Sequence, residues 1–206
     1  WNRFPLRARL ARLCGAPTYV DNDAKALALA EGWVGEAFNS RNFLAMVVST
    51  GVGGGVVLDG RLLDGRSRNA GHVGHVVVEP EGRPCSCGGR GCLEAEASGT
   101  AIAAFTGRSP SEAGPDVVRR TGRLVGRAVA DVANLLDLDL AVVAGSVALG
   151  FGEPFFAAAR QELAERARLE FSVRTRIIPA GLGAGGPLIG AGAVGWRGLG
   201  RLGSFL

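Results

Sequence analysis

The chain has 206 residues, 47% of them hydrophobic, and its 23 basic and 19 acidic side chains give a net charge of +4. This length allows one large domain with a substantial core, and the mild, scattered charge argues against an extended nucleic-acid surface. The densest basic run, residues 119–127, has helical spacing and is interpreted as a solvated helix face.

Helical periodicity predicts helices over residues 6–13, 24–36, 93–105 and 153–169, and a longer helix after the link at residues 107–115. Apolar runs predict strands over residues 18–20, 43–49, 56–58, 61–63, 140–143 and 173–178. Asp59-Gly60 indicates a tight hairpin turn, with a glycine-rich bend at the hairpin's first corner. Strands alternating with helices, plus one hairpin, predict an α/β domain with a mixed sheet.

No segment has the character of a membrane span or a targeting peptide. Residues 177–196 carry no charge, but glycines and prolines interrupt them, so we expect a buried turn leading into a final helix. A cytoplasmic location and no membrane partner are therefore expected. Because Trp1 is not an initiator methionine, we expect the chain to be a fragment of a longer protein.

Residues 72–94 contain both histidines and three of the four cysteines. Cys85 and Cys87 form a C-x-C pair, Cys92 follows after four residues, and His75 lies upstream. Three thiolates and one imidazole are the ligand set of a closed tetrahedral zinc site. Disulfides fit poorly, because one possible ring is very small and the other leaves a cysteine unpaired. The remaining cysteine, Cys14, is interpreted as a small buried residue.

Two further stretches are ambiguous on their own. The sequence TGVGGG at residues 50–55 could present N–H groups to a phosphate, but a hairpin corner needs the same glycines. Asn22 and Asp23 stand between a predicted strand and a predicted helix. They are either a helix cap or an amide that orients a substrate beside a general base.

Together these motifs resemble the ROK family, named for repressors, open reading frames and kinases, which has the actin-like (ribonuclease H-like) fold of sugar kinases. The most specific element is Gly74-His75 followed by C-x-C-G-x-x-G-C-x-E at residues 85–94. The motifs V-x-N-D-A, T-G-x-G-G-G and A-G-S-V begin at residues 20, 50 and 144, in the expected order. The resemblance implies that residues 21–206 are mainly the C-terminal lobe, with a zinc loop at 72–94. Residues 1–20 would be the remnant that joins a missing N-terminal lobe.

The resemblance also implies roles for individual residues. Asp23 would be the catalytic base, and a hexose would be bound by Asn22, His75 and Glu94. ATP, with Mg²⁺, would be bound by Thr50, Gly51, Gly53, Gly54, Gly55, Gly145 and Ser146. Zinc would be structural, held by His75, Cys85, Cys87 and Cys92.

Three departures from the family pattern stand out. His72 occupies the position where family kinases usually have a sugar-binding glutamate; it either contacts the sugar or caps the loop beside the zinc. Ala144 replaces the first of two glycines near the adenosine. The motif Asp-x-Gly-Gly-Thr of the N-terminal lobe is absent from the sequence, so residues 1–206 alone are not expected to be an active kinase.

Two functions fit this pattern. The first is a sugar kinase that transfers the γ-phosphoryl group of ATP to a hexose hydroxyl. The second is the sugar-sensing domain of a transcriptional repressor, which would bind nucleic acid only through an upstream helix-turn-helix. A zinc-stabilised interaction module without a ligand would leave Asp23 and Glu94 without a role. The family resemblance further implies a homo-oligomer.

Overall fold

The computed structural model describes residues 4–202, which form a five-stranded mixed sheet in the order β3-β2-β1-β4-β5. Its strands are β1 (Phe43–Val48), β2 (Val52–Leu58), β3 (Arg61–Leu62), β4 (Leu140–Ala144) and β5 (Arg176–Pro179). The pairs β1–β2 and β2–β3 are antiparallel, whereas β1–β4 and β4–β5 are parallel. The predicted α/β domain with a mixed sheet is confirmed.

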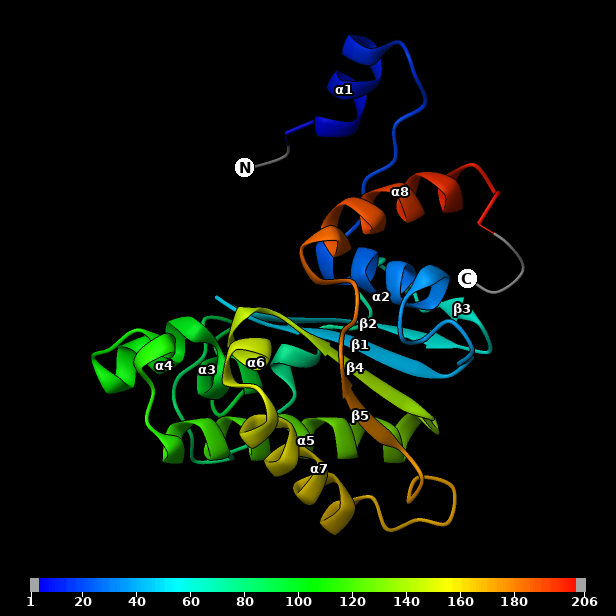
Figure 1. Cartoon of the computed structure of the whole chain (residues 1–206). Helices are drawn as coiled ribbons and strands as arrows, with labels where there is room; N and C mark the ends of the chain where they lie inside the picture. The colour runs from blue at the N-terminus through cyan, green and yellow to red at the C-terminus, as the bar shows by residue number, and fades with distance from the viewer. Residues whose placement is uncertain (1–3, 203–206) are drawn as a thin grey trace.

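Helices cover both faces of the sheet (Figure 1). One layer consists of α2 (Asp23–Val34) and α8 (Gly186–Gly198), and the other consists of α5 (Pro115–Leu136) and α7 (Glu153–Arg166). The central strand β1 therefore has two buried faces. Leu44 and Met46 belong to one apolar cluster and Phe43 and Ala45 to the other, as the alternation of side chains along a strand requires.

The short helices gather where the parallel strands β1 and β4 end (Figure 1). They are α3 (Leu93–Ala97), α4 (Gly99–Thr106), α6 (Ser146–Phe151) and the 3-10 turns η1 (Val73–His75) and η2 (Pro110–Glu112); a further turn, η3 (Gly183–Gly185), precedes α8. The Gly99 N–H donates to the Ser49 carbonyl at 2.7 Å, which fixes α4 to the end of β1. Ligands of open α/β sheets bind at this edge.

The N-terminal helix α1 (Leu6–Cys14) has no buried residue and stands apart from the other helices (Figure 1). Cys14 is exposed, so its interpretation as a buried residue was wrong. Residues 18–20, predicted as a strand, have no regular structure. No helix within residues 4–202 is both long and apolar enough to cross a bilayer.

The predicted hairpin is present, but the glycine-rich bend at its first corner is shorter than predicted. The bend is confined to residues 49–51, and Gly53, Gly54 and Gly55 lie inside β2, paired with β1. Close packing of α2 explains these glycines. A Cβ at Gly55 would lie 2.8 Å from the Ala28 Cβ and 3.0 Å from the Lys25 Cα. The bare backbone of β2 therefore lets α2 approach the sheet.

Candidate functional site

A pocket of about 500 Å³ opens beside the bend that follows β1. Its walls come from the start of α2, the bend and first residues of β2, the segment before η1, η1 itself and the start of α3. The predicted residues that line it are Asn22, Asp23, Thr50, Gly51, Gly53, Gly54, His72, His75 and Glu94. One cavity therefore contains all the residues that were predicted to be catalytic or sugar-binding, and after that prediction we call it the sugar pocket.

Asn22 caps α2 and Asp23 is its first residue, and each side chain keeps a polar atom that a ligand could bind. Asn22 Oδ1 accepts hydrogen bonds from the N–H groups of Ala24 (2.9 Å) and Lys25 (3.3 Å), and Asp23 Oδ1 accepts from Ala24 (2.8 Å). The helix-cap interpretation is therefore confirmed. Among residues 4–202, nothing hydrogen-bonds to the Asn22 amide nitrogen or to Asp23 Oδ2. Capping and ligand binding are thus compatible.

In the sequence, His72 and Glu94 flank the candidate metal ligands, which span residues 75–92. Glu94 Oε2 accepts a hydrogen bond from the Val52 N–H at 3.0 Å, which fixes the carboxylate beside the bend. His72 precedes η1 but makes no side-chain hydrogen bond to it, so the structure does not support a capping role. Its ring stacks against His75 with centroids 6.0 Å apart. An exposed imidazole in the pocket wall is available to a ligand.

His75, Cys85, Cys87 and Cys92 form a cluster that could hold a metal ion. Their ligand atoms all lie within 4.8 Å of one another. Cys85 Sγ is 3.6 Å from His75 Nδ1, and Cys87 Sγ is 3.7 Å from Cys92 Sγ. A tetrahedral zinc ion with Zn–S bonds of about 2.3 Å needs sulfur atoms about 3.7 Å apart. The donor set and its spacing therefore fit zinc and exclude a disulfide in this structure.

The pKa values of two of the cysteine thiols are shifted in opposite directions. The Gly89 N–H lowers the pKa of the Cys87 thiol, whereas burial raises the pKa of the Cys92 thiol to about 12. A cation at the centre of the cluster would reverse the effect of burial, because it stabilises the thiolate. Backbone bonds between Cys85 and residues 88 and 89 close the turn around the sulfur atoms.

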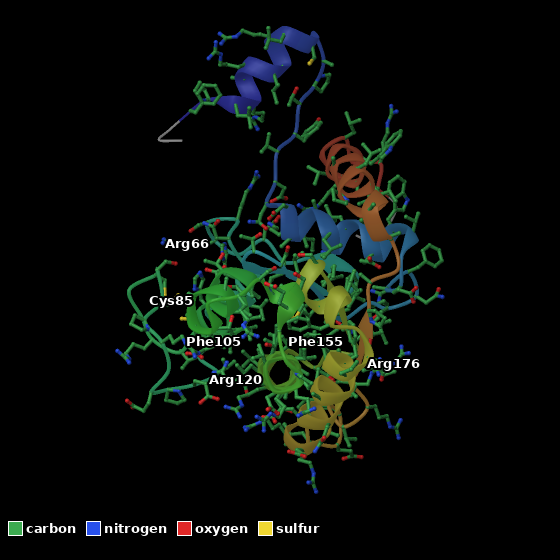
Figure 2. All side chains as sticks on the ribbon, turned by 60° about the vertical axis from the view of Figure 1, so that its left-hand side comes forward. Arg66, Cys85, Phe105, Arg120, Phe155 and Arg176 are labelled. Carbon is green, nitrogen blue, oxygen red and sulfur yellow. The ribbon has the colours of Figure 1, made fainter. Side chains whose placement is uncertain are left out.

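One buried carboxylate, that of Glu96, joins the metal-ligand loop (residues 72–94) to α5. Glu96 is 1% exposed and pairs with Arg83 and with Arg120, the latter at 2.6 Å. Burial alone would raise the pKa of Glu96, but the Arg83 N–H and the two guanidinium groups lower it below its usual value. Arg83 also lies over the Phe105 ring at 4.2 Å. Cys85, Phe105 and Arg120 accordingly lie on the same side of the molecule (Figure 2).

Arg127 makes a second attachment. Its guanidinium donates to the Val78 carbonyl at 2.6 Å and to Glu79 Oε1 at 2.9 Å. The basic run at residues 119–127 was therefore wrongly interpreted as a purely solvated face. Arg120 and Arg127 bind acidic and carbonyl groups that are distant in sequence, which helical spacing cannot reveal.

The predicted adenosine-binding residues lie next to the sugar pocket. Gly145 and Ser146 line a mainly apolar cavity of about 810 Å³, and Asp23 and Val47 line both this cavity and the sugar pocket. Ser146 Oγ is 2.9 Å from Ser49 Oγ. A third cavity of about 680 Å³ has Thr50, Thr100, Ser109, Ser111 and Ser146 among its lining residues. Among the predicted phosphate-binding residues, only Gly55 lines none of these cavities.

Glycine at position 145 has a backbone explanation. Its φ angle is +103°, and a Cβ would collide with the Val48 carbonyl. Arg68 and Asn69, which the sequence analysis did not select, also line the sugar pocket. In the sequence, the feature that could have identified them is a pair of polar residues shortly before His72.

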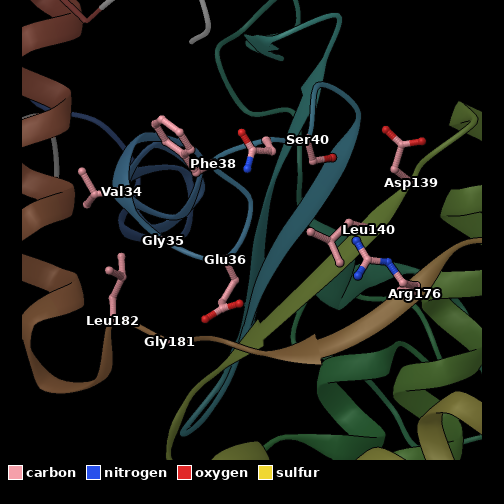
Figure 3. A pocket seen from close by; sticks show the side chains of 11 residues that line it. Val34, Gly35, Glu36, Phe38, Ser40, Asp139, Leu140, Arg176, Gly181 and Leu182 are labelled. Atoms are coloured by element: carbon pink, nitrogen blue, oxygen red, sulfur yellow. The ribbon is translucent and has the colours of Figure 1, made fainter.

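A separate pocket of about 650 Å³ lies at the opposite edge of the sheet (Figure 3). Its lining includes Glu36, Asp139 and Arg176, near the amino ends of the parallel strands. It contains none of the predicted site residues, and Arg176 lies far from Cys85 in Figure 2. The predicted site residues that line cavities therefore lie near the carboxyl ends of the parallel strands β1 and β4.

Comparison with known proteins decides the family. A model described as "ROK family" matches residues 1–196. This chain belongs to the ROK family. The N-acetylmannosamine kinase of Citrobacter koseri is 42% identical over 177 residues, which are 79% of this chain and 60% of that protein. The glucokinase of Thermotoga maritima is 48% identical over 105 residues, 51% of this chain and 33% of the enzyme.

Solved structures of ROK proteins have the same fold. The ROK hexokinase of Thermus thermophilus has a TM-score of 0.82 and 34% identity, over 96% of this chain and 71% of the hexokinase. A ROK transcriptional regulator homologous to the MLC protein of E. coli has a TM-score of 0.82 and 27% identity, over 96% of this chain and 56% of the regulator. The resemblance to the ROK family and its actin-like fold is confirmed. This ROK chain spans about 60% of the first kinase's length and a third of the second's.

Proposed function

We propose that this ROK chain supplies the sugar pocket and the catalytic base of an ATP-dependent sugar kinase, with residues 21–206 as its C-terminal lobe. One observation carries the proposal: Asp23 lines both the sugar pocket and the cavity that contains Gly145 and Ser146. A base in that position can reach a sugar hydroxyl on one side while the nucleotide lies on the other.

The mechanism follows from the capped geometry of α2. The amide of Asn22 and the carboxylate of Glu94 orient the sugar hydroxyls, and Asp23 accepts the proton of the hydroxyl that attacks the γ-phosphorus of ATP. The phosphoryl group moves to the sugar oxygen and ADP leaves. The backbone around Thr50 and Gly51, together with Ser146, would hold the phosphates of ATP and the Mg²⁺ ion.

Zinc is the metal that we propose for the cysteine cluster. His75 Nδ1 faces Cys85 Sγ, so the Nε2 atom of the same ring is free to donate to a sugar hydroxyl. When bound, zinc supplies a cross-link that keeps His75 and Glu94 at a fixed separation. It takes no part in phosphoryl transfer.

N-acetylmannosamine is the first substrate to test, because the N-acetylmannosamine kinase of C. koseri is 42% identical over most of this chain. We expect the full-length protein to bind N-acetylmannosamine in calorimetric titration and to form ADP from ATP only when this sugar is present. Glucose, the substrate named for the T. maritima relative, is the matched comparison. The kinase proposal is wrong if sugars bind and no sugar-dependent ADP appears.

A sugar-sensing repressor is the second candidate, supported by the similarity to the ROK transcriptional regulator. In that case the same pocket binds sugar without turnover, and an upstream helix-turn-helix provides the DNA contacts. A homo-oligomer, predicted from the family, would suit either function and can be checked by analytical ultracentrifugation. The cytoplasmic location also stays a prediction.

Substitutions at His72 test whether this side chain contributes to sugar affinity. Replacing His72 with Ala should weaken sugar binding about fivefold, since one neutral hydrogen bond contributes about 1 kcal/mol. His72→Glu restores an acceptor at the usual family position and should retain or improve affinity. Calorimetry on the three proteins tests this, with the zinc content measured in each. Equal affinities in all three would remove His72 from sugar recognition.

A further inference from the structure

A buried lysine, Lys25, is among the residues that line the sugar pocket. The Lys25 side chain is 2% exposed, and its Nζ lies 2.6 Å from Asp64 Oδ1 and 3.5 Å from Asp21 Oδ1. Nζ also donates to the Arg68 carbonyl at 3.4 Å. An unpaired ammonium group would be very unfavourable at this depth. These three oxygen atoms therefore determine where the side chain can lie.

Arg197 of α8 completes a closed ring of four charges. It pairs with Asp64 Oδ2 at 2.8 Å and with Asp21 Oδ2 at 3.6 Å. Each carboxylate thus stands between two cations. The hydrogen bond from Arg197, followed by that from Lys25, lowers the pKa of Asp64 to about 2, so its carboxylate stays charged under ordinary conditions. The ring connects the residue before the α2 cap, α2, the segment after β3 and α8.

The segment after β3, residues 64–70, is a wall of the sugar pocket. Arg68, Asn69 and Ala70 line the pocket, and the segment has no helix or strand. Arg68 has a φ of +61°, unusual for a residue with a side chain. Within residues 4–202, the side-chain hydrogen bonds that join this segment to α2 and α8 all pass through Asp64 or the Arg68 carbonyl. Lys25 makes contact with both.

We propose that Lys25 is a positioning residue for the sugar: it anchors residues 64–70 as a pocket wall through Asp64 and the Arg68 carbonyl. The inference rests on the proposed sugar-kinase function. The Asn22 cap uses the backbone N–H of Lys25 and not its side chain. Loss of the ammonium group therefore loosens the wall and leaves Asp23 in place, which weakens sugar binding without slowing phosphoryl transfer.

The test is Lys25→Met in the full-length protein, because methionine fills a similar volume without charge. We expect KM and the calorimetric Kd for N-acetylmannosamine to rise about tenfold, equivalent to about 1.4 kcal/mol, while kcat stays within about twofold. Trypsin should cleave faster after Arg66 and Arg68, located by mass spectrometry, and sugar should protect these bonds in the wild-type protein. Arg119→Met, which removes an exposed pair with Asp116, is the matched control and should change none of these quantities.

Asp64→Asn weakens the same Lys25–Asp64 contact by changing the residue in the pocket wall. This second variant tests the proposal if Lys25→Met does not fold. It should reproduce the loss of affinity, and the double variant should bind no more weakly than the weaker single variant. Wild-type affinity in a folded variant, or a fall in kcat with KM unchanged, would overturn the proposal. If the wild-type protein binds no sugar, the proposed function fails, and the trypsin comparison without sugar still shows whether Lys25 anchors the wall.

Discussion

Replacing Asp23 with Asn is expected to lower kcat for sugar phosphorylation at least about 100-fold, the range in which a general base contributes. Asparagine retains the shape and can still accept from the Ala24 N–H, as Asp23 Oδ1 does at 2.8 Å, so α2 stays capped. The amide cannot take the hydroxyl proton. Sugar affinity should therefore change little. A coupled ATP assay and a calorimetric titration of the same preparation measure the two quantities.

Asp116 offers the matched control for this substitution. It also lies in the first turn of a helix, α5, and its side chain is 96% exposed. Asp116→Asn should leave kcat and affinity unchanged. Undiminished turnover in Asp23→Asn would exclude Asp23 as the base, and a loss of sugar binding equal to the loss of turnover would assign it to binding instead.

Loss of the metal is expected to produce the second large effect. We expect one zinc ion per chain by elemental analysis, and Cys87→Ser should abolish it. Structural zinc contributes about 10–16 kcal/mol of binding energy in small zinc domains, and this energy stabilises the fold. Residues 72–94 should therefore lose their ordered conformation, with a lower Tm and no detectable sugar binding. Cys87 is exposed, so the substitution itself creates no cavity.

Cys14→Ser is the control for the zinc prediction, since Cys14 is an exposed cysteine outside the cluster. It should keep the zinc content, the Tm and the sugar affinity of the parent protein. Purified protein without zinc that retains its Tm and its affinity for sugar would contradict the structural role of the metal.

The metal cluster and the pocket differ in how far the sequence could predict them. His75 and the three cysteines lie within 18 residues, and their chemistry leaves few alternatives, so local spacing was sufficient. Asn22 and Asp23 lie at the start of α2, whereas Glu94 lies on α3. Local chemistry left Asn22 and Asp23 ambiguous; only the family resemblance united all three residues, and the cavity shows them together.

The errors arose where tertiary contacts override local signals. The glycines of β2 were interpreted as a bend because the approach of α2 is invisible in a single segment. The predicted helix over residues 93–105 is divided at Ser98, whose extended backbone and hydroxyl cap start α4 anew. The partners of Arg120 and Arg127 lie far away in the chain, beyond the reach of periodicity.

The hydrogen bond from the Val52 N–H to Glu94 limits how the proposed sugar site can be altered. Glu94 both lines the sugar pocket and stabilises the backbone beside the bend, so we expect any substitution there to change sugar recognition and the local backbone together. The His72 side chain, by contrast, makes no hydrogen bond to any described residue, although its ring stacks on His75. Substitutions at His72 should therefore change sugar selectivity with little loss of stability. Substitutions at Glu94 would also remove the hydrogen bond from Val52, so we expect laboratory evolution to retain Glu94.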